Sequence, residues 1–251
     1  MSLGNTLRQA SLRDVFIKRE LKRIRVEGID ADEVYIEEII KRCPKGCKIL
    51  DIGTGTAHIP VSILKKKGED VEIIAVDISL ASVKIAKKNI SKYGNVHLLR
   101  ADGYNLPFKD SSFNEVIVRL APHSIREAYR VLKENGWYIH RACGQFNCWK
   151  EIHEVFGERA FPYAKAEWWK TSFKRLERYN SVGFKDVYEM AFLVKKYYTF
   201  EQMVKEMLFN PIVRNFDLKR DIDKLKELER RFGTKDGIRI TADPLIILAR
   251  K

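Results

Sequence analysis

The chain has 251 residues, of which 45% are hydrophobic, a composition ordinary for a globular protein with one α/β domain. No apolar run reaches the ~18 residues needed to span a membrane, and the charged stretch 1–25 lacks the apolar core of a secretion signal. Composition therefore excludes a membrane-spanning protein and predicts a cytoplasmic one.

The net charge of +13 could serve a polyanionic partner such as RNA. However, the basic residues are spread along the chain among many acids. Charged residues make up 32% of the sequence and glutamine is scarce, which is typical of the ion-pair-rich surfaces of thermophilic proteins. The charge alone therefore leaves RNA binding open.

Two helices are expected before the first strand. Apolar residues recur near helical spacing over 6–25, with basic residues between them, and Gly28 ends this first helix. Asp30 is placed to cap a second helix, which Pro44 and Gly46 end. These helices are predicted to cover the domain at its N-terminal side.

The middle of the chain alternates short β-rich runs with helices. Such alternation predicts a parallel sheet with right-handed crossovers, whose ligands bind beyond the carboxyl ends of the strands. The expected strands are 48–52, 71–76, 96–100, 113–118 and 137–142, and the expected helices are 59–67, 79–92 and 124–133, with a turn at 134–136.

The alternation loosens after residue 142. Helices are expected over 146–156, 166–179, 200–208 and 217–232. The two apolar runs 184–194 and 238–248 are predicted to pair as a terminal hairpin, interrupted by a helical insertion at about 198–234.

Three acids stand at the carboxyl ends of three successive strands: Asp51, Asp77 and Asp102. The Gly-Thr-Gly turn 53–55 follows the first of them, where glycine lets the backbone approach a ligand closely. Asp77 follows that turn by about one βα unit, the spacing at which a carboxylate reaches the two hydroxyls of a ribose. A nucleotide-like ligand is therefore expected at this edge of the sheet.

These residues resemble the class I S-adenosylmethionine-dependent methyltransferases, in particular the ubiquinone-biosynthesis-like (type 11) group. The resemblance runs in the family's order from about Lys48 to His140, and its motifs are Ile49-Leu-Asp-Ile-Gly-Thr-Gly-Thr, Ile74-Ala-Val-Asp-Ile-Ser, Leu99-Arg-Ala-Asp-Gly, Phe113-Asn-Glu-Val-Ile-Val and Arg130-Val-Leu-Lys-Glu-Asn-Gly-Trp. It implies a Rossmann-like, seven-stranded, mostly parallel sheet with an antiparallel last strand.

The expected domain plan is a single methyltransferase domain over 1–251. It comprises N-terminal helices at 1–43, a cofactor-binding core at 44–142, and substrate-side helices with the terminal hairpin at 143–251. The resemblance implies S-adenosyl-L-methionine as cofactor, with Asp77 on the ribose and Asp102 near the adenine. The predicted cofactor-binding residues are Asp51, Gly53, Thr54, Gly55, Asp77, Ile78, Asp102, Gly103 and Arg119.

Two positions depart from the family pattern, Ala57 at the third glycine and Asn114 where an aspartate is common. The main alternative fold assignment is an NAD-type Rossmann domain. That motif wants a third glycine two residues after Gly55 and a small residue where Pro60 stands. A structural turn is a further alternative. Spermidine-synthase-like enzymes would carry a richer glycine run.

The acceptor side is defined less well by the sequence. His123 follows the fourth strand, where the family places residues beside the transferred methyl, and is the candidate general base. The predicted function is methyl transfer to a small-molecule acceptor. RNA methylation is the alternative, because Ala121-Pro122 and Gly136-Trp137 resemble the ribosomal RNA guanine-N1 methyltransferases. A non-catalytic cofactor-binding protein is a third possibility, and the oligomeric state is left open.

The four cysteines form two closely spaced pairs, Cys43 with Cys47 and Cys143 with Cys148. Such spacing is compatible with zinc. However, Cys47 precedes the first strand whereas Cys143 follows a later parallel strand, so the two pairs are expected at opposite ends of the sheet. The sequence therefore predicts small buried side chains and no metal site.

Overall fold

The computed structural model describes residues 24–144, 148–160, 168–209 and 212–251. The expected helix 6–25 and its basic face lie almost entirely outside the described residues. At its last residue the expectation is wrong, because Arg25 begins the strand β1 (Arg25–Glu27). Val26 there pairs with Lys196 of another strand, so a long-range partner decides the conformation.

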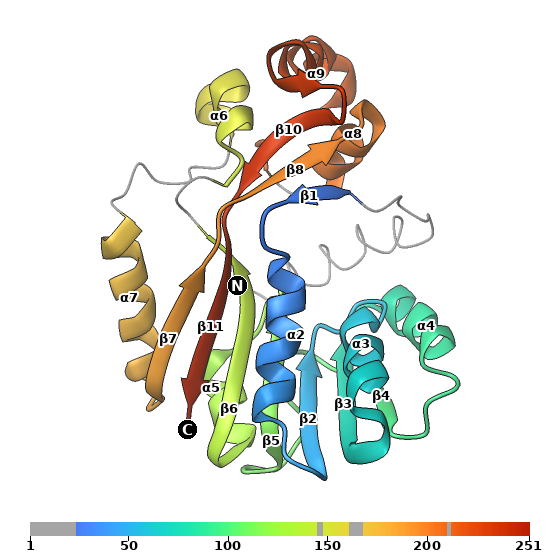
Figure 1. Ribbon diagram of the computed structural model, residues 1–251, viewed down its shortest axis with the longest axis vertical. Helices are drawn as coiled ribbons and strands as arrows, with labels where there is room; N and C mark the ends of the chain where they lie inside the picture. Colours follow the sequence, from blue (N-terminus) through green and yellow to red (C-terminus); the bar gives the residue numbers. More distant parts are fainter. Residues whose placement is uncertain (1–23, 145–147, 161–167, 210–211) are drawn as a thin grey trace.

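The described residues form a seven-stranded sheet, here called the main sheet, in the order β4-β3-β2-β5-β6-β11-β7 (Figure 1). Neighbours from β4 to β6 run parallel, whereas β11 is antiparallel to both β6 and β7. This confirms the predicted Rossmann-like fold with an antiparallel last strand. The strands are β2 (Cys47–Ile52), β3 (Val71–Asp77), β4 (Val96–Arg100), β5 (Phe113–Arg119), β6 (Leu132–Cys143), β7 (Lys185–Ala191) and β11 (Pro244–Arg250).

Helices cover both faces of the main sheet, as a largely parallel sheet requires. One face packs against α2 (Ala31–Arg42), α3 (His58–Lys67) and α4 (Leu80–Asn89), with a 3₁₀ turn at Gly68–Asp70. The other packs against α5 (Ile125–Val131) and the end of α7 (Trp168–Asn180). The predicted cap at Asp30 forms, and the side chains of Asp30, Ser79 and Ser124 each accept from a backbone N–H in the first turn of their helix.

A smaller antiparallel sheet, here called the second sheet, lies on the side toward which the carboxyl ends of the parallel strands point (Figure 1). A separate apolar cluster, centred on residues such as Met203, Leu225 and Ile240, packs it against three helices. Its strands are β1, β8 (Val194–Tyr198), β10 (Gly237–Ala242) and β9 (Gly233–Thr234), and its helices are α6 (Lys150–Phe156), α8 (Phe200–Phe209) and α9 (Leu218–Phe232), with a 3₁₀ turn at Gly157–Arg159.

The predicted terminal hairpin is present but divided between the two sheets. Strands β7 and β11 pair in the main sheet, and their continuations β8 and β10 pair in the second. Phe192 still donates its N–H to the Pro244 carbonyl at 3.0 Å, which keeps the ribbon in register across the junction. Proline has no N–H for a ladder and restricts the residue before it, so one strand becomes two at Asp243–Pro244.

The prediction of a turn at 134–136 is wrong. These residues lie within β6, and the β5–β6 register shifts between Phe113 and Glu115. Asn135 takes a left-handed conformation, φ 61°, and donates to the Lys251 carbonyl at 3.0 Å. The chain bulges here without reversing, because Lys251, which directly follows β11, pairs with it. Within the described part of the chain, no helix combines the length and apolar character needed to cross a membrane.

Candidate active site

The loops after β2 and β3 are tied together by the Asp77 carboxylate. Gly55 donates its N–H to Asp77 Oδ2 at 2.8 Å, and Ser79 donates its N–H to Asp77 Oδ1 at 2.9 Å. A carboxylate oxygen can accept more than one hydrogen bond. Asp77 is therefore held at the carboxyl edge of the sheet in a form that suits a diol.

The two glycines of the loop have different surroundings. Gly53 has φ +74°, and a Cβ there would lie 2.1 Å from the Ala121 Cβ, so Gly53 allows the loop after β5 to pack closely. Gly55 has φ +59°, and no described atom lies within 4 Å of its Cβ position. Its left-handed backbone therefore borders open space. Helix α3 begins after Ala57 without a side-chain cap, so its first N–H groups are available to a ligand.

Asp51, at the end of β2, is buried with only 2% of its surface exposed. Its Oδ2 and the Thr54 hydroxyl have no hydrogen-bond partner among the described residues. Burial, together with the nearby Asp77 carboxylate, raises the pKa of the Asp51 carboxyl to about 7. Buried polar atoms without partners are typical of sites that a ligand completes. Together with Asp77 and the open face of Gly55, they fit a cofactor that carries hydroxyl and ammonium groups.

The loop after β4 closes the same edge. Asp102 Oδ1 accepts the N–H of Tyr104 at 2.9 Å. A Cβ on the buried Gly103 would lie 2.8 Å from Ile52 Cγ2 and 3.0 Å from the Pro122 carbonyl oxygen. Gly103 is therefore needed where the segments after β2, β4 and β5 meet. The structure thus gathers the predicted acids and glycines at one edge of the sheet.

His123 is held at both ring nitrogens. Nδ1 lies 2.9 Å from the Ala121 carbonyl oxygen, and Nε2 lies 2.6 Å from the Tyr138 hydroxyl. A carbonyl only accepts, so Nδ1 carries the proton and Nε2 accepts from Tyr138. Burial lowers the pKa of His123. Taking a proton from an acceptor would therefore require Nε2 to leave Tyr138.

A charged cluster that sequence reasoning missed lies beside this loop. Arg119 Nη2 donates to Asp32 Oδ2 at 2.5 Å, and Arg141 Nε donates to Asp32 Oδ1 at 3.1 Å. Burial alone would raise the pKa of Asp32, but Arg119 and then Arg141 lower it overall. In the sequence Asp32 resembles an ordinary first-turn acid, and only the packing of α2 on β5 and β6 joins the three groups.

Leu120 lies between the cluster and His123. It is 39% exposed and has φ 52°, a conformation that costs a non-glycine residue free energy. Its N–H donates to the Arg141 carbonyl at 3.0 Å. Strained residues gather at binding sites, and an exposed leucine beside two arginines gives this edge both apolar and cationic character.

The fold and these loops define a class I S-adenosylmethionine-dependent methyltransferase. Residues 44–207 match the family described as methyltransferase domain, which is more than half of the chain. The chain belongs to that family, and it is an enzyme that uses S-adenosylmethionine.

Relatives and solved structures agree with this assignment. The demethylmenaquinone methyltransferase of Staphylococcus saprophyticus is 26% identical over 218 residues, covering 75% of this chain and 94% of the relative. A Bacillus halodurans structure with a provisional methyltransferase name has a TM-score of 0.59 at 21% identity, covering 88% of this chain and 99% of that one. Phosphoethanolamine N-methyltransferase 2 of Haemonchus contortus, solved with S-adenosyl-L-methionine, has a TM-score of 0.54 at 17% identity over 87% of this chain and 51% of that one. The two structures show the common fold.

Proposed function

We propose that this methyltransferase acts on a quinone-type small molecule. The observation that carries the proposal is the similarity to the demethylmenaquinone methyltransferase, which spans 94% of that relative. The exposed Leu120 and the Arg119 guanidinium beside it suit an apolar ring that bears oxygen atoms. The substrate for which that relative is named favours a small molecule over the RNA alternative.

The proposal gives each group at the edge of the main sheet a role toward the cofactor. Asp77 accepts from the ribose hydroxyls, Asp102 lies near the adenine, and the orphaned oxygen of Asp51 accepts from the ammonium group. Gly55 leaves room for the methionine part. The other proposed cofactor-binding residues are Gly53, Thr54, Ile78, Gly103 and Arg119.

S-adenosylmethionine supplies an electrophilic methyl group on a sulfonium, which the acceptor atom must approach in line. Holding two reactants in that geometry provides much of the rate enhancement. The loop 119–124 does this in our proposal, because Gly53 anchors it against the cofactor loop. His123 as general base stays a prediction, and this conformation gives it a positioning role through Tyr138.

The test uses the purified full chain with methyl-labelled S-adenosylmethionine. Demethylmenaquinone in detergent micelles, total RNA and a water-soluble metabolite extract serve as acceptors in parallel. We expect label in the quinone fraction. Asp77→Asn should weaken cofactor binding by about tenfold or more, since a charged hydrogen-bond acceptor is worth about 1.5–3 kcal/mol. Isothermal titration calorimetry measures that loss.

Glu72→Gln is the matched control, because it makes the same acid-to-amide change on the same strand β3. Glu72 lies at the other end of the strand and is 44% exposed, paired with Lys48 on the surface. It should leave binding and transfer unchanged. Label in RNA or in the aqueous extract, with none in the quinone, would refute the proposed acceptor.

A further inference from the structure

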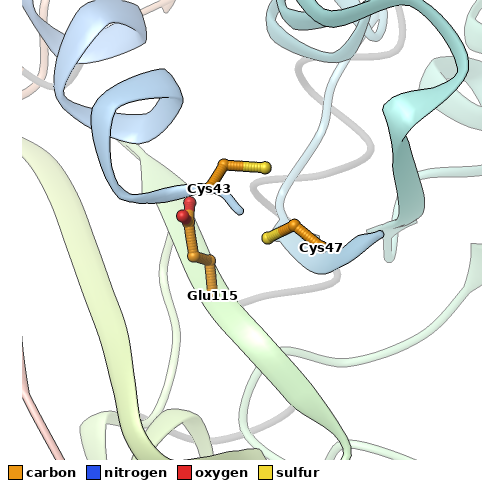
Figure 2. A group of neighbouring side chains, drawn as sticks. All are labelled: Cys43, Cys47 and Glu115. Carbon is orange, nitrogen blue, oxygen red and sulfur yellow. The ribbon is translucent and has the colours of Figure 1, made fainter. Parts of the chain in front are cut away.

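Three potential metal ligands meet at the end of the main sheet opposite the candidate active site. They are Cys43 at the C-cap of α2, Cys47 at the start of β2, and Glu115 on β5. Their ligand atoms all lie within 4.8 Å of one another. Figure 2 shows the two thiol groups and the carboxyl group around a common space.

The register of the sheet explains why these groups share one face. Glu115 lies directly beside Ile49 on the neighbouring parallel strand. Side chains two residues apart on a strand point to the same face, so Cys47 lies on the face that carries Glu115. Helix α2 covers this face and ends there with Cys43. Sequence spacing could show the two cysteines but not the acid 68 positions beyond Cys47.

The Glu115 carboxyl group lacks a hydrogen-bond partner within the described part of the chain. The residue is fully buried, with 0% exposed, and neither of its oxygens has a hydrogen-bond partner there. Cys43 and Cys47 are 4% and 1% exposed. Leaving a carboxyl group buried without partners costs free energy, and a bound cation would remove that cost.

The donor set and its surroundings suit a soft divalent metal ion. Thiolates select zinc over magnesium and calcium, and Cys-x3-Cys lies within the spacing that zinc sites use. Two thiolates and a carboxylate around a divalent ion leave one negative charge. Lys67 lies close enough to balance it, since its ammonium donates to the Cys43 carbonyl at 2.8 Å. The exposed turn 44–46 between the cysteines gives an ion a short path in.

We infer that Cys43, Cys47 and Glu115 form a zinc site, with a water molecule as the remaining ligand. It replaces the sequence expectation of no metal. The site ties the end of α2 to β2 and β5, and it is separate from the proposed cofactor residues, which lie at the other ends of these strands. The inference of a zinc site does not depend on which acceptor the enzyme methylates.

The test loads the full chain, reduced and treated with chelator, with Zn²⁺ or Co²⁺. We expect one equivalent of zinc per chain by mass spectrometry of the metal, a thiolate-to-cobalt charge-transfer absorption band, and a higher melting temperature with zinc. Cys43→Ser combined with Cys47→Ser should abolish the band and the shift, and Glu115→Gln should weaken zinc binding at least ~tenfold.

The matched control is Cys143→Ser combined with Cys148→Ser, which removes the other close pair and should keep the band. If the first double variant fails to fold, the wild type still decides the matter, because zinc should slow alkylation of Cys43 and Cys47 but not of the exposed Cys143. No bound metal in the wild type, an unchanged band in Cys43→Ser/Cys47→Ser, or an unchanged zinc affinity in Glu115→Gln would overturn the site.

Discussion

His123 belongs to a partly buried polar cluster of four aromatic side chains, the others being Tyr138, His140 and Tyr179. His140 Nδ1 lies 3.2 Å from the Tyr179 hydroxyl, and the His123 and His140 rings are 4.9 Å apart. Burial, and then His123, lowers the pKa of His140 well below its usual value. The folded protein therefore keeps this imidazole neutral at pH values where a solvated histidine is charged.

This difference makes stability depend on pH. In the unfolded chain His140 takes up a proton below about pH 6.5, whereas the folded protein does not. The free energy of unfolding should then fall as the pH drops below that value, by about 1.4 kcal/mol per unit for one such group. Between pH 7 and 5 the free energy of unfolding of His140→Gln should therefore fall by about 1–2 kcal/mol less than that of the wild type. Urea denaturation at each pH measures the difference.

His97→Gln is the control, since that side chain is 58% exposed on the surface. Comparing variants is necessary because Asp51 acts in the opposite direction. Its pKa of about 7 lies above its ordinary value of 3.8, so its contribution to stability is lost as the pH rises toward 7. An equal fall in the free energy of unfolding of the wild type and of His140→Gln between pH 7 and 5 would contradict the prediction.

At the scale of single elements, the loop between β2 and α3 performs two separable tasks. Gly53→Ala places a methyl group 2.1 Å from Ala121 Cβ at a positive φ, so we expect a loss of about 3 kcal/mol from overpacking and backbone strain. Gly55→Ala meets no described atom and should cost only about 1 kcal/mol. Chemical denaturation measures both.

Cofactor affinity should separate the two variants further. In Gly55→Ala the new methyl group extends into the space proposed for the methionine part of the cofactor. The free energy of S-adenosylmethionine binding should therefore fall by more than the free energy of unfolding does. Calorimetry on the folded fraction gives the affinity. Equal destabilisation by the two alanines would show that Ala121 moves aside readily.

At the scale of the whole molecule, a continuous two-stranded ribbon joins two hydrophobic cores. The cluster around the second sheet contains a bidentate ion pair, in which Arg159 donates to both carboxylate oxygens of Asp221 at 2.7 and 2.8 Å. Asp221 is 1% exposed, and Arg159 lowers its pKa. This pair connects the 3₁₀ turn that follows α6 to α9.

Removing the pair should loosen one core before the other. Arg159→Met leaves Asp221 buried with fewer partners, which should cost about 2 kcal/mol. Hydrogen exchange should then rise in α9 and α6 more than in α4. Arg231→Met removes a half-exposed pair with Glu154 between the same two helices and should cost less than about 1 kcal/mol. Uniform loss of protection in all three helices would show a single cooperative unit.

The sequence by itself determined the parallel core and the polar groups at its carboxyl edge. Local signals suffice there, because strand runs, capping residues such as Asp30 and Ser79, and the Gly-Thr-Gly turn act within a few positions of one another. Since the carboxyl ends of parallel strands share one edge, the strand pattern alone places Asp51, Asp77 and Asp102 together.

Only the tertiary structure decided how distant residues combine. The ion pairs of Asp32 with Arg119 and Arg141, the tie between His123 and Tyr138, and the meeting of Glu115 with two cysteines depend on register and helix packing. So does the division of the terminal hairpin, where each strand leaves one sheet for the other. These features join residues far apart in the chain, and periodicity and spacing carry no information about such contacts.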